Sequence, residues 1–175
     1  NLFPPGTAGT RPEIYVMGCR NPFRIYIDRH TEFLYWGDVG PDASEDRFER
    51  GPRGYDEVNQ AREPGYFGWP LFVADNKPYN QFLFVDSIAS KKYNPTAPIN
   101  DSPHNTGLRD LPGAQPAFIW YPYVESLDFP LLGSGGRNAM AGLVYYFDDY
   151  KNTKKNFPRY YDKKLFIYDW MRGWI

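Results

Sequence analysis

The residues best suited to chemistry fall in one acidic turn and in two arginine–asparagine pairs. The turn runs from Asp38 to Asp46 and crowds carboxylates around Gly40 and Pro41. Carboxylates and backbone carbonyls in such a turn are ligands for a hard cation such as Ca²⁺, which takes about six to eight oxygens. The glycine and the proline do not fit an EF-hand loop, so we favour a solvated acidic turn and keep a cation site as the alternative.

Each arginine–asparagine pair follows a glycine-containing turn and precedes a predicted strand. The pairs are Arg20-Asn21 and Arg137-Asn138. A guanidinium is a rigid fork for a carboxylate, and an amide both donates and accepts hydrogen bonds. Either pair therefore suits an acidic cofactor or substrate, although a surface salt bridge in a turn is the more common role.

Other reactive side chains have no motif around them. His30 lies in a predicted turn and His104 in a long polar loop, and we expect both to face solvent. No serine-hydrolase, zinc-protease, phosphate-loop or dinucleotide motif is present, which excludes those classes at the motif level. The single cysteine, Cys19, permits no internal disulfide and is expected to be a small buried residue.

Charge and hydropathy exclude two kinds of partner. The chain has 20 basic and 21 acidic side chains, a net charge of -1. No basic field is available to hold nucleic acid or an anionic membrane. No apolar stretch approaches the roughly 18 to 20 residues of a membrane helix. We therefore expect neither a nucleic acid partner nor direct membrane insertion.

The hydropathy pattern predicts short strands and little helix. Aromatic residues make up 19% of the chain and favour pleated surfaces, while 16 Gly and 17 Pro favour turns. The clearest element is an antiparallel hairpin of residues 23–28 and 33–36, joined by a five-residue polar turn. Further strands are predicted at residues 14–17, 55–59, 82–85, 117–121, 141–147 and 165–170. Such a series is typical of a sandwich or a β-propeller, and the sequence period does not choose between them.

Four motifs follow one another in the first part of the chain: Glu13-Ile14-Tyr15-Val16-Met17-Gly18-Cys19-Arg20-Asn21-Pro22-Phe23-Arg24, Gly37-Asp38-Val39-Gly40, Tyr55-Asp56-Glu57-Val58-Asn59 and Gly65-Tyr66-Phe67-Gly68-Trp69-Pro70. In this order they resemble the glucose/sorbosone dehydrogenase family, which comprises secreted or periplasmic sugar dehydrogenases that depend on the quinone cofactor PQQ. The resemblance implies an all-β fold, a partial six-bladed β-propeller of about three blades. We expect a single segment, 1–175, of a propeller domain: residues 13–73 match best, 74–116 form a long irregular insertion loop and 117–175 supply further blade strands.

The resemblance also implies site residues and cofactors. Arg20 and Asn21 correspond to the pair that faces PQQ, and the carbonyls of Gly40 and Pro41 correspond to ligands of its calcium ion. The family's catalytic histidine comes from a preceding blade, so we expect no catalytic residue in this chain. Met171 stands where some members have a lysine that contacts the cofactor.

The expected function follows from this resemblance. The chain begins without Met and ends inside a predicted strand, so we expect a piece of a secreted or periplasmic protein, with the cell surface as another location. The parent would oxidise an aldose or related alcohol group of a sugar or polysaccharide-derived substrate, with a cytochrome c domain or other segments of the same parent as partners. The alternative is a non-catalytic propeller module that binds glycan or protein through the loop 74–116 and the aromatic surface of Trp120, Tyr121 and Tyr123.

Overall fold

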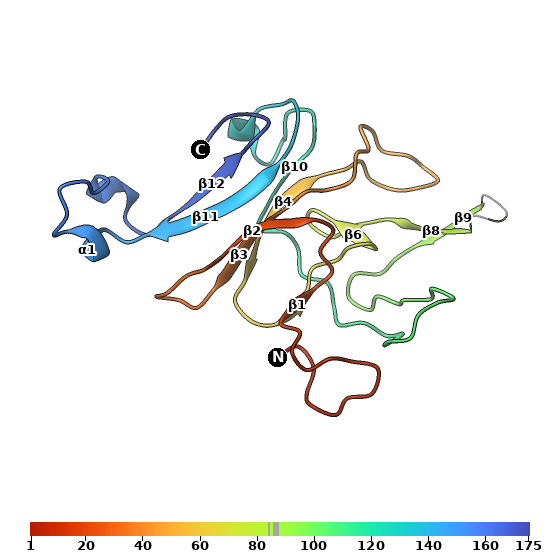
Figure 1. Cartoon of the computed structure of the whole chain (residues 1–175). Helices are drawn as coiled ribbons and strands as arrows, with labels where there is room; N and C mark the ends of the chain where they lie inside the picture. Colours follow the sequence, from red (N-terminus) through yellow and green to blue (C-terminus); the bar gives the residue numbers. More distant parts are fainter. Residues whose placement is uncertain (84, 86–87) are drawn as a thin grey trace.

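Short strands joined by turns form most of the regular structure in the computed structural model, which describes residues 1–83, 85 and 88–175 (Figure 1). The strands are β1 (Val16–Met17), β2 (Pro22–Ile27), β3 (Leu34–Asp38), β4 (Asp56–Ala61), β5 (Gly65–Tyr66), β6 (Phe72–Val73), β7 (Lys77–Pro78), β8 (Asn80–Leu83), β9 (Ile88–Lys92), β10 (Ile119–Tyr121), β11 (Ala139–Tyr145) and β12 (Lys164–Asp169). Helix within these residues amounts to α1 (Phe147–Tyr150) and the 3-10 turns η1 (Pro130–Leu132) and η2 (Arg159–Tyr161). The prediction of an all-β fold is confirmed.

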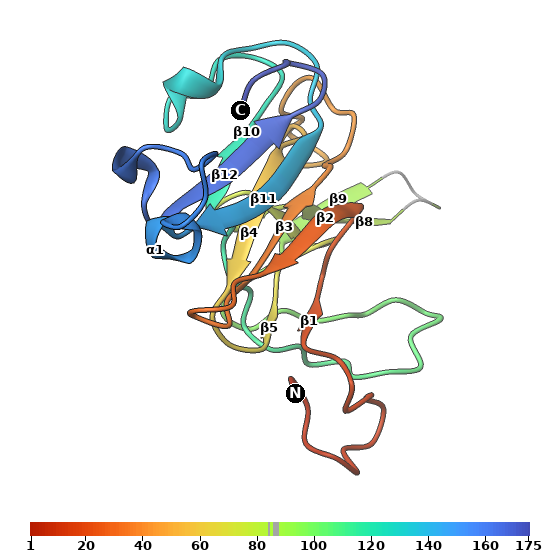
Figure 2. The same ribbon diagram turned by 60° about the vertical axis from the view of Figure 1, so that its left-hand side comes forward.

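A four-stranded antiparallel sheet in the order β10-β4-β3-β2 forms the centre of the molecule (Figure 2). The predicted hairpin is β2 and β3, in which Tyr26 pairs with Tyr35 and Ile27 with Leu34. A bulge at Arg24, whose φ is +59°, shifts the register within β2. Because side chains alternate between the two faces, Tyr35 and Trp36 enter cores on opposite sides of the sheet.

The β11–β12 hairpin lies against one face of this sheet (Figure 2). The core between the hairpin and the central sheet contains Tyr35, Val58, Tyr121 and Val144. The backbones approach so closely that a β-carbon built on Gly37 would lie 2.0 Å from the carbonyl oxygen of Ala139. A four-stranded sheet with a second hairpin packed on its face is consistent with a partial propeller.

The opposite face of the sheet is covered in part. Trp36 packs there with Ala61 and the edge of the Phe67 ring. Toward the outer edge of β2 the cover ends, and Ile25 and Ile27 are 66% and 63% exposed. β2, the less covered strand, is therefore also one of the two edge strands of the sheet.

The segment 74–116 contains more strand than its sequence indicates. β7 pairs with β6, and β8 pairs with β9 in a hairpin that extends away from the central sheet (Figure 1). The predicted strand 82–85 overlaps the end of β8, and its residue 84 lies outside the described residues. The irregular part returns to the sheet through the amides of Gln115 and Ala117, which donate to the carbonyls of Tyr66 and Ala74.

Arg172 organises the loop between β10 and β11. Its guanidinium donates hydrogen bonds to the carbonyls of Pro122, Leu132, Gly133 and Gly136, at distances of 2.6 to 2.9 Å. Four bonds from one rigid cation fix the path of this loop, which leads directly into β11.

None of the described helices has the length and apolar character needed to cross a membrane.

Candidate functional site

The beginning of β2 and the turn after β3 meet in one corner of the molecule. The carboxylate of Asp38 accepts hydrogen bonds from the backbone amides of Arg20 at 3.0 Å and Asn21 at 2.6 Å. The Arg20 guanidinium in turn donates to the carbonyl of Val39 at 2.9 Å. We call residues 20–21 and 38–41 the β2–β3 corner. Pairing of the adjacent strands, with Pro22 opposite Asp38, is what brings these two motifs together.

The corner presents a cation and an amide to solvent. Arg20 and Asn21 are exposed, and the Arg20 guanidinium lies 5.7 Å from the centre of the Trp69 ring. Arg20, Gly40, Pro41 and Trp69 line one small hollow of about 10 Å³. The residues predicted from separate motifs therefore lie side by side at one surface.

Asp56 connects the β2–β3 corner to β11. Its carboxylate accepts hydrogen bonds from the amides of Gly40 at 3.1 Å and Ala139 at 2.9 Å, so it links the turn to β11. The side chain is fully buried, and burial raises the pKa of Asp56 while the nearby Arg137 opposes that rise. Gly40 has to be glycine here, because its β-carbon would lie 1.7 Å from the carbonyl oxygen of Tyr55. Asp56 thus shapes the loop that carries Gly40.

Glu57 holds a second loop. Its carboxyl group accepts a hydrogen bond of 2.6 Å from the amide of Ala74 and one of 3.1 Å from the side chain of Asn59. Burial raises the pKa of Glu57 to about 8 and that of Asp38 to about 6. Both carboxyl groups therefore hold the loops of the site in place, and both line the small hollow beside Arg20.

Arg137 lies between Asp56 and the turn. Its Nη1 is 3.3 Å from Asp56 and its Nη2 donates a hydrogen bond of 2.9 Å to the carbonyl of Pro41. The guanidinium also lies 3.9 Å from the centre of the Tyr123 ring, and the hydroxyl of Tyr123 donates to Asp42. The Arg137 side chain is 1% exposed. Arg137, from the second arginine–asparagine motif, therefore forms a buried ion pair with Asp56 and contacts the same turn as Arg20.

This arrangement does not suit a calcium ion on the Pro41 carbonyl. An ion at the usual distance of about 2.4 Å from that oxygen could lie no farther than about 5 Å from Arg137 Nη2. At an effective dielectric constant of about 20, the repulsion between the two cations would be about 6 kcal/mol. In the part of the chain that the structure describes, no cluster of three His, Cys, Asp or Glu side chains is arranged to hold a metal ion.

An anionic cofactor suits the outer side of the corner better. The exposed Arg20 guanidinium keeps one nitrogen on Val39 and offers its remaining N–H groups to a carboxylate. Asn21 adds an amide beside it. This donor set matches the carboxylates of PQQ, whereas neither residue offers an anionic ligand for a metal.

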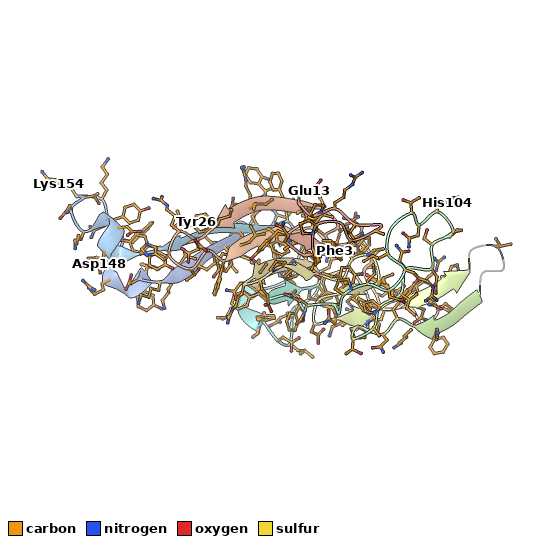
Figure 3. All side chains as sticks on the ribbon, turned by 90° about the horizontal axis from the view of Figure 1, so that it is seen from below. Phe3, Glu13, Tyr26, His104, Asp148 and Lys154 are labelled. Carbon is orange, nitrogen blue, oxygen red and sulfur yellow. The ribbon has the colours of Figure 1, made fainter. Side chains whose placement is uncertain are left out.

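The histidines lie away from the corner. His30 stacks on Tyr146 with ring centroids 3.7 Å apart, and its Nε2 is 2.9 Å from Asp149, beside α1. His104 is exposed near the opposite end of the molecule from Asp148 (Figure 3). The expectation that both histidines face solvent is confirmed, and His30 has these contacts because the hairpin turn folds against the segment that follows β11.

Other predicted residues have mixed outcomes. Tyr121 is fully buried, so the proposed aromatic surface of Trp120, Tyr121 and Tyr123 is wrong at its central member. Met171 is 62% exposed and packs beside Gly136. Cys19 is half-buried rather than fully buried, and burial raises the pKa of its thiol to about 12.

A groove next to the corner is lined in part by the segment 74–116, which the sequence predicts as a binding loop without indicating the residues that line it. It has a volume of about 550 Å³ and shares Pro41 and Trp69 with the small hollow beside Arg20. Its aromatic lining comes from four residues that are separated in the sequence, namely Trp69, Tyr79, Phe82 and Tyr93. The many aromatic residues between positions 66 and 93 indicate aromatic contacts in this region. They do not predict that β8 folds back toward Trp69.

The comparisons with known proteins give one match. The family model described as Glucose / Sorbosone dehydrogenase matches residues 3–108, which is more than half of the chain. No curated protein and no solved structure matches this chain. The matched residues include the β2–β3 corner, Asp56, Glu57 and most of the segment 74–116. The chain therefore belongs to the glucose/sorbosone dehydrogenase family.

Proposed function

We propose that this chain is part of a sugar dehydrogenase in which the β2–β3 corner binds PQQ and the parent protein oxidises an aldose or a related alcohol group. The observation that supports it most is the meeting of Arg20, Asn21 and the Gly40-Pro41 turn at one exposed corner. Family membership supports the sugar class of substrate. The same family likeness favours an exported protein, in the periplasm or outside the cell, with a cytochrome c domain as a candidate electron acceptor.

Each residue of the corner has a defined task in this proposal. Arg20 binds a carboxylate of the cofactor, and Asn21 supplies a second polar contact beside it. Asp38 keeps both residues in place through their backbone amides. When bound, PQQ supplies a quinone that accepts the hydride removed from the sugar carbon. The proton of the sugar hydroxyl requires a base, and we assign that base to none of the residues in this chain.

Calcium has a weaker place in the proposal than PQQ. Gly40 and Pro41 correspond to its ligands in the family, but the Pro41 carbonyl already accepts a hydrogen bond from Arg137. We therefore base no step on a calcium ion.

The direct test is binding of PQQ to the purified protein, followed by tryptophan fluorescence, with and without Arg20→Gln. We expect saturable binding that weakens by about tenfold or more, since a hydrogen bond to a charged group contributes about 1.5 to 3 kcal/mol. Arg24→Gln is the matched control, because Arg24 is exposed on β2, just after Arg20, and lies over Phe23. Aldose-dependent reduction of an artificial electron acceptor by the PQQ-loaded, full-length parent then tests catalysis. Absence of PQQ binding would remove the proposal.

The groove favours a second candidate function, glycan binding without catalysis. Its aromatic walls can stack on sugar rings, and Asn80, Glu45 and Arg47 can bond to hydroxyl groups along its edge. Titration with a panel of neutral and acidic oligosaccharides tests this function. Trp69→Ala should abolish binding, and Trp170→Ala, at a tryptophan that is 75% exposed elsewhere, should leave it unchanged. Glycan binding without PQQ binding would favour this second function over the first.

A further inference from the structure

The positive charge beneath the β2–β3 corner belongs to the chain itself. We propose that Arg137 is a built-in cation: its guanidinium takes the place beside the Pro41 carbonyl that the family resemblance assigns to calcium, and the corner is complete without a divalent metal ion. The inference concerns the metal alone and does not depend on whether PQQ binds.

The charges around Arg137 balance without a metal ion. Its guanidinium lies between the carboxylate of Asp56, at 3.3 Å, and the carbonyl of Pro41, at 2.9 Å. Both charged side chains are buried, at 1% and 0% exposure. An arginine stays protonated throughout the accessible pH range, so Asp56 has a permanent counterion.

The guanidinium has no room to move aside for a metal ion. One of its faces lies 3.9 Å from the centre of the Tyr123 ring. A β-carbon built on Gly54 would lie 3.0 Å from Nη2 and 1.7 Å from the carbonyl oxygen of Pro41, so glycine at this position makes the contact possible. Because the amide of Gly54 donates to the carbonyl of Ala43, the turn is closed around Arg137. A calcium ion would have to displace the arginine from a packed position.

The carboxylates near the corner already have partners. Asp38 accepts from the amides of the two residues that begin the corner. Asp56 accepts from Gly40 and Ala139, and Asp42 accepts from the hydroxyl of Tyr123. A calcium ion takes about six to eight oxygens and would compete with all of these bonds.

The cost of burying Arg137 indicates that its charge is needed. Within the described residues its Nε has no hydrogen-bond partner, and an unpaired buried donor destabilises a fold. A side chain that only filled space would avoid this penalty if it were uncharged, as methionine is. The guanidinium is therefore present for its charge and for its bond to Pro41.

The first test is a metal titration of the purified protein after treatment with EGTA. Tb³⁺ replaces Ca²⁺ and luminesces when a nearby tryptophan transfers energy to it, and Trp69 lines the same hollow as Gly40 and Pro41. We expect no Tb³⁺ luminescence through Trp69 and the same unfolding midpoint in EGTA and in CaCl₂. Luminescence that saturates at one ion and is lost in Trp69→Phe would overturn the proposal.

The second test exchanges the arginine for a metal. Arg137→Met leaves Asp56 and the Pro41 carbonyl without a cation, so we expect a lower unfolding midpoint in EGTA and partial recovery in CaCl₂. The double variant Asp56→Asn/Arg137→Met should not respond to CaCl₂, and neither should Arg53→Met, which breaks the more exposed pair with Asp46. A folded Arg137→Met that ignores CaCl₂ would contradict the proposal. If Arg137→Met does not fold in either buffer, the Tb³⁺ titration of the unmodified protein is the test of the proposal.

Discussion

Tyr121 donates a hydrogen bond of 2.6 Å to the carboxylate of Asp169, and this bond joins the two packed sheets. Tyr121 ends β10 of the central sheet, whereas Asp169 ends β12 of the hairpin. The same carboxylate accepts hydrogen bonds from the amides of Asn138 and Arg172, both at 2.8 Å. The segment that carries Arg137 is thus held in position by a polar contact buried between the sheets.

Removing the Tyr121 hydroxyl should destabilise this junction. We expect Tyr121→Phe to lower the free energy of unfolding by about 1.5 to 3 kcal/mol, because the lost bond is buried and ends on a carboxylate. Urea unfolding followed by tryptophan fluorescence measures the change. Tyr123→Phe removes a hydroxyl bonded to Asp42 near the surface and should cost less than about 0.5 kcal/mol. Equal losses in the two variants would contradict this account.

Replacing Arg172 should loosen one loop. Lysine keeps the charge of Arg172 but cannot reproduce its fork, so Arg172→Lys leaves several carbonyls between Pro122 and Gly136 without donors. Hydrogen exchange should become at least about tenfold faster at the amides of Gly133 and Gly135, which now donate within this loop. Exchange in the β2–β3 hairpin serves as the internal reference. Unchanged protection of residues 130–137 would show that the loop holds without Arg172.

Stability should fall as the pH rises from 5 to 8. Burial raises the folded-state pKa of Glu57 from 4.5 to about 8 and that of Asp38 from 3.8 to about 6. The folded state therefore binds protons more tightly than the unfolded state. This contribution is complete below the unfolded pKa values and is lost as the pH rises through the folded ones, at up to about 1.4 kcal/mol per pH unit for each proton.

Glu57→Gln should remove most of this pH dependence above pH 6. The Oδ1 atom of Asn59 has no partner among the described residues, and turning the Asn59 amide lets it accept a bond from a protonated Glu57 or from the glutamine. The variant should therefore fold and be more stable than the unmodified protein at pH 8. Denaturant titrations at a series of pH values provide the check, and a parallel pair of stability curves would refute the role of Glu57.

A methyl group at position 37 should separate the two sheets. The β-carbon of Gly37→Ala would lie 2.0 Å from the carbonyl oxygen of Ala139, and neither backbone can move without breaking strand pairs. We expect a loss of at least about 3 kcal/mol in the free energy of unfolding. Gly113→Ala is the control, since its nearest neighbours would lie 3.8 Å away, and it should change stability by less than about 0.5 kcal/mol. Thermal unfolding of both variants gives the comparison.

The parts of the fold that could be predicted from the sequence depend on local pattern. Alternation in residues 23–28 and the polar turn after them correctly predict the β2–β3 hairpin, although the apolar Ile25 and Ile27 lie on its exposed face. The four motifs likewise predict that Arg20 and the Gly40-Pro41 turn belong to one site, and the structure brings them together. Their roles toward a cofactor stay a prediction.

The remaining features depend on contacts between distant segments. Arg137 meets Pro41 across 96 positions, and nothing in the sequence next to either residue specifies the other. The sequence predicts a short strand at 55–59 without indicating that Glu57 is buried, yet β4 is covered on both sides and the side chain is buried. The predicted strand 55–59 is polar and lies in the sequence between apolar strands. This pattern could have indicated buried charges, because charged side chains inside a sheet need partners within the fold. β6 and β7 were missed because two residues are too few to show an alternating pattern.

The contact between Gly37 and Ala139 also limits how this protein can evolve. Every amino acid other than glycine carries a β-carbon, so each possible mutation at position 37 meets the same obstacle whatever its polarity or size. A lineage could leave glycine at this position only after the second sheet had shifted or been lost. Variation should therefore accumulate in the outer loops, while this one position stays fixed for as long as the two sheets remain packed.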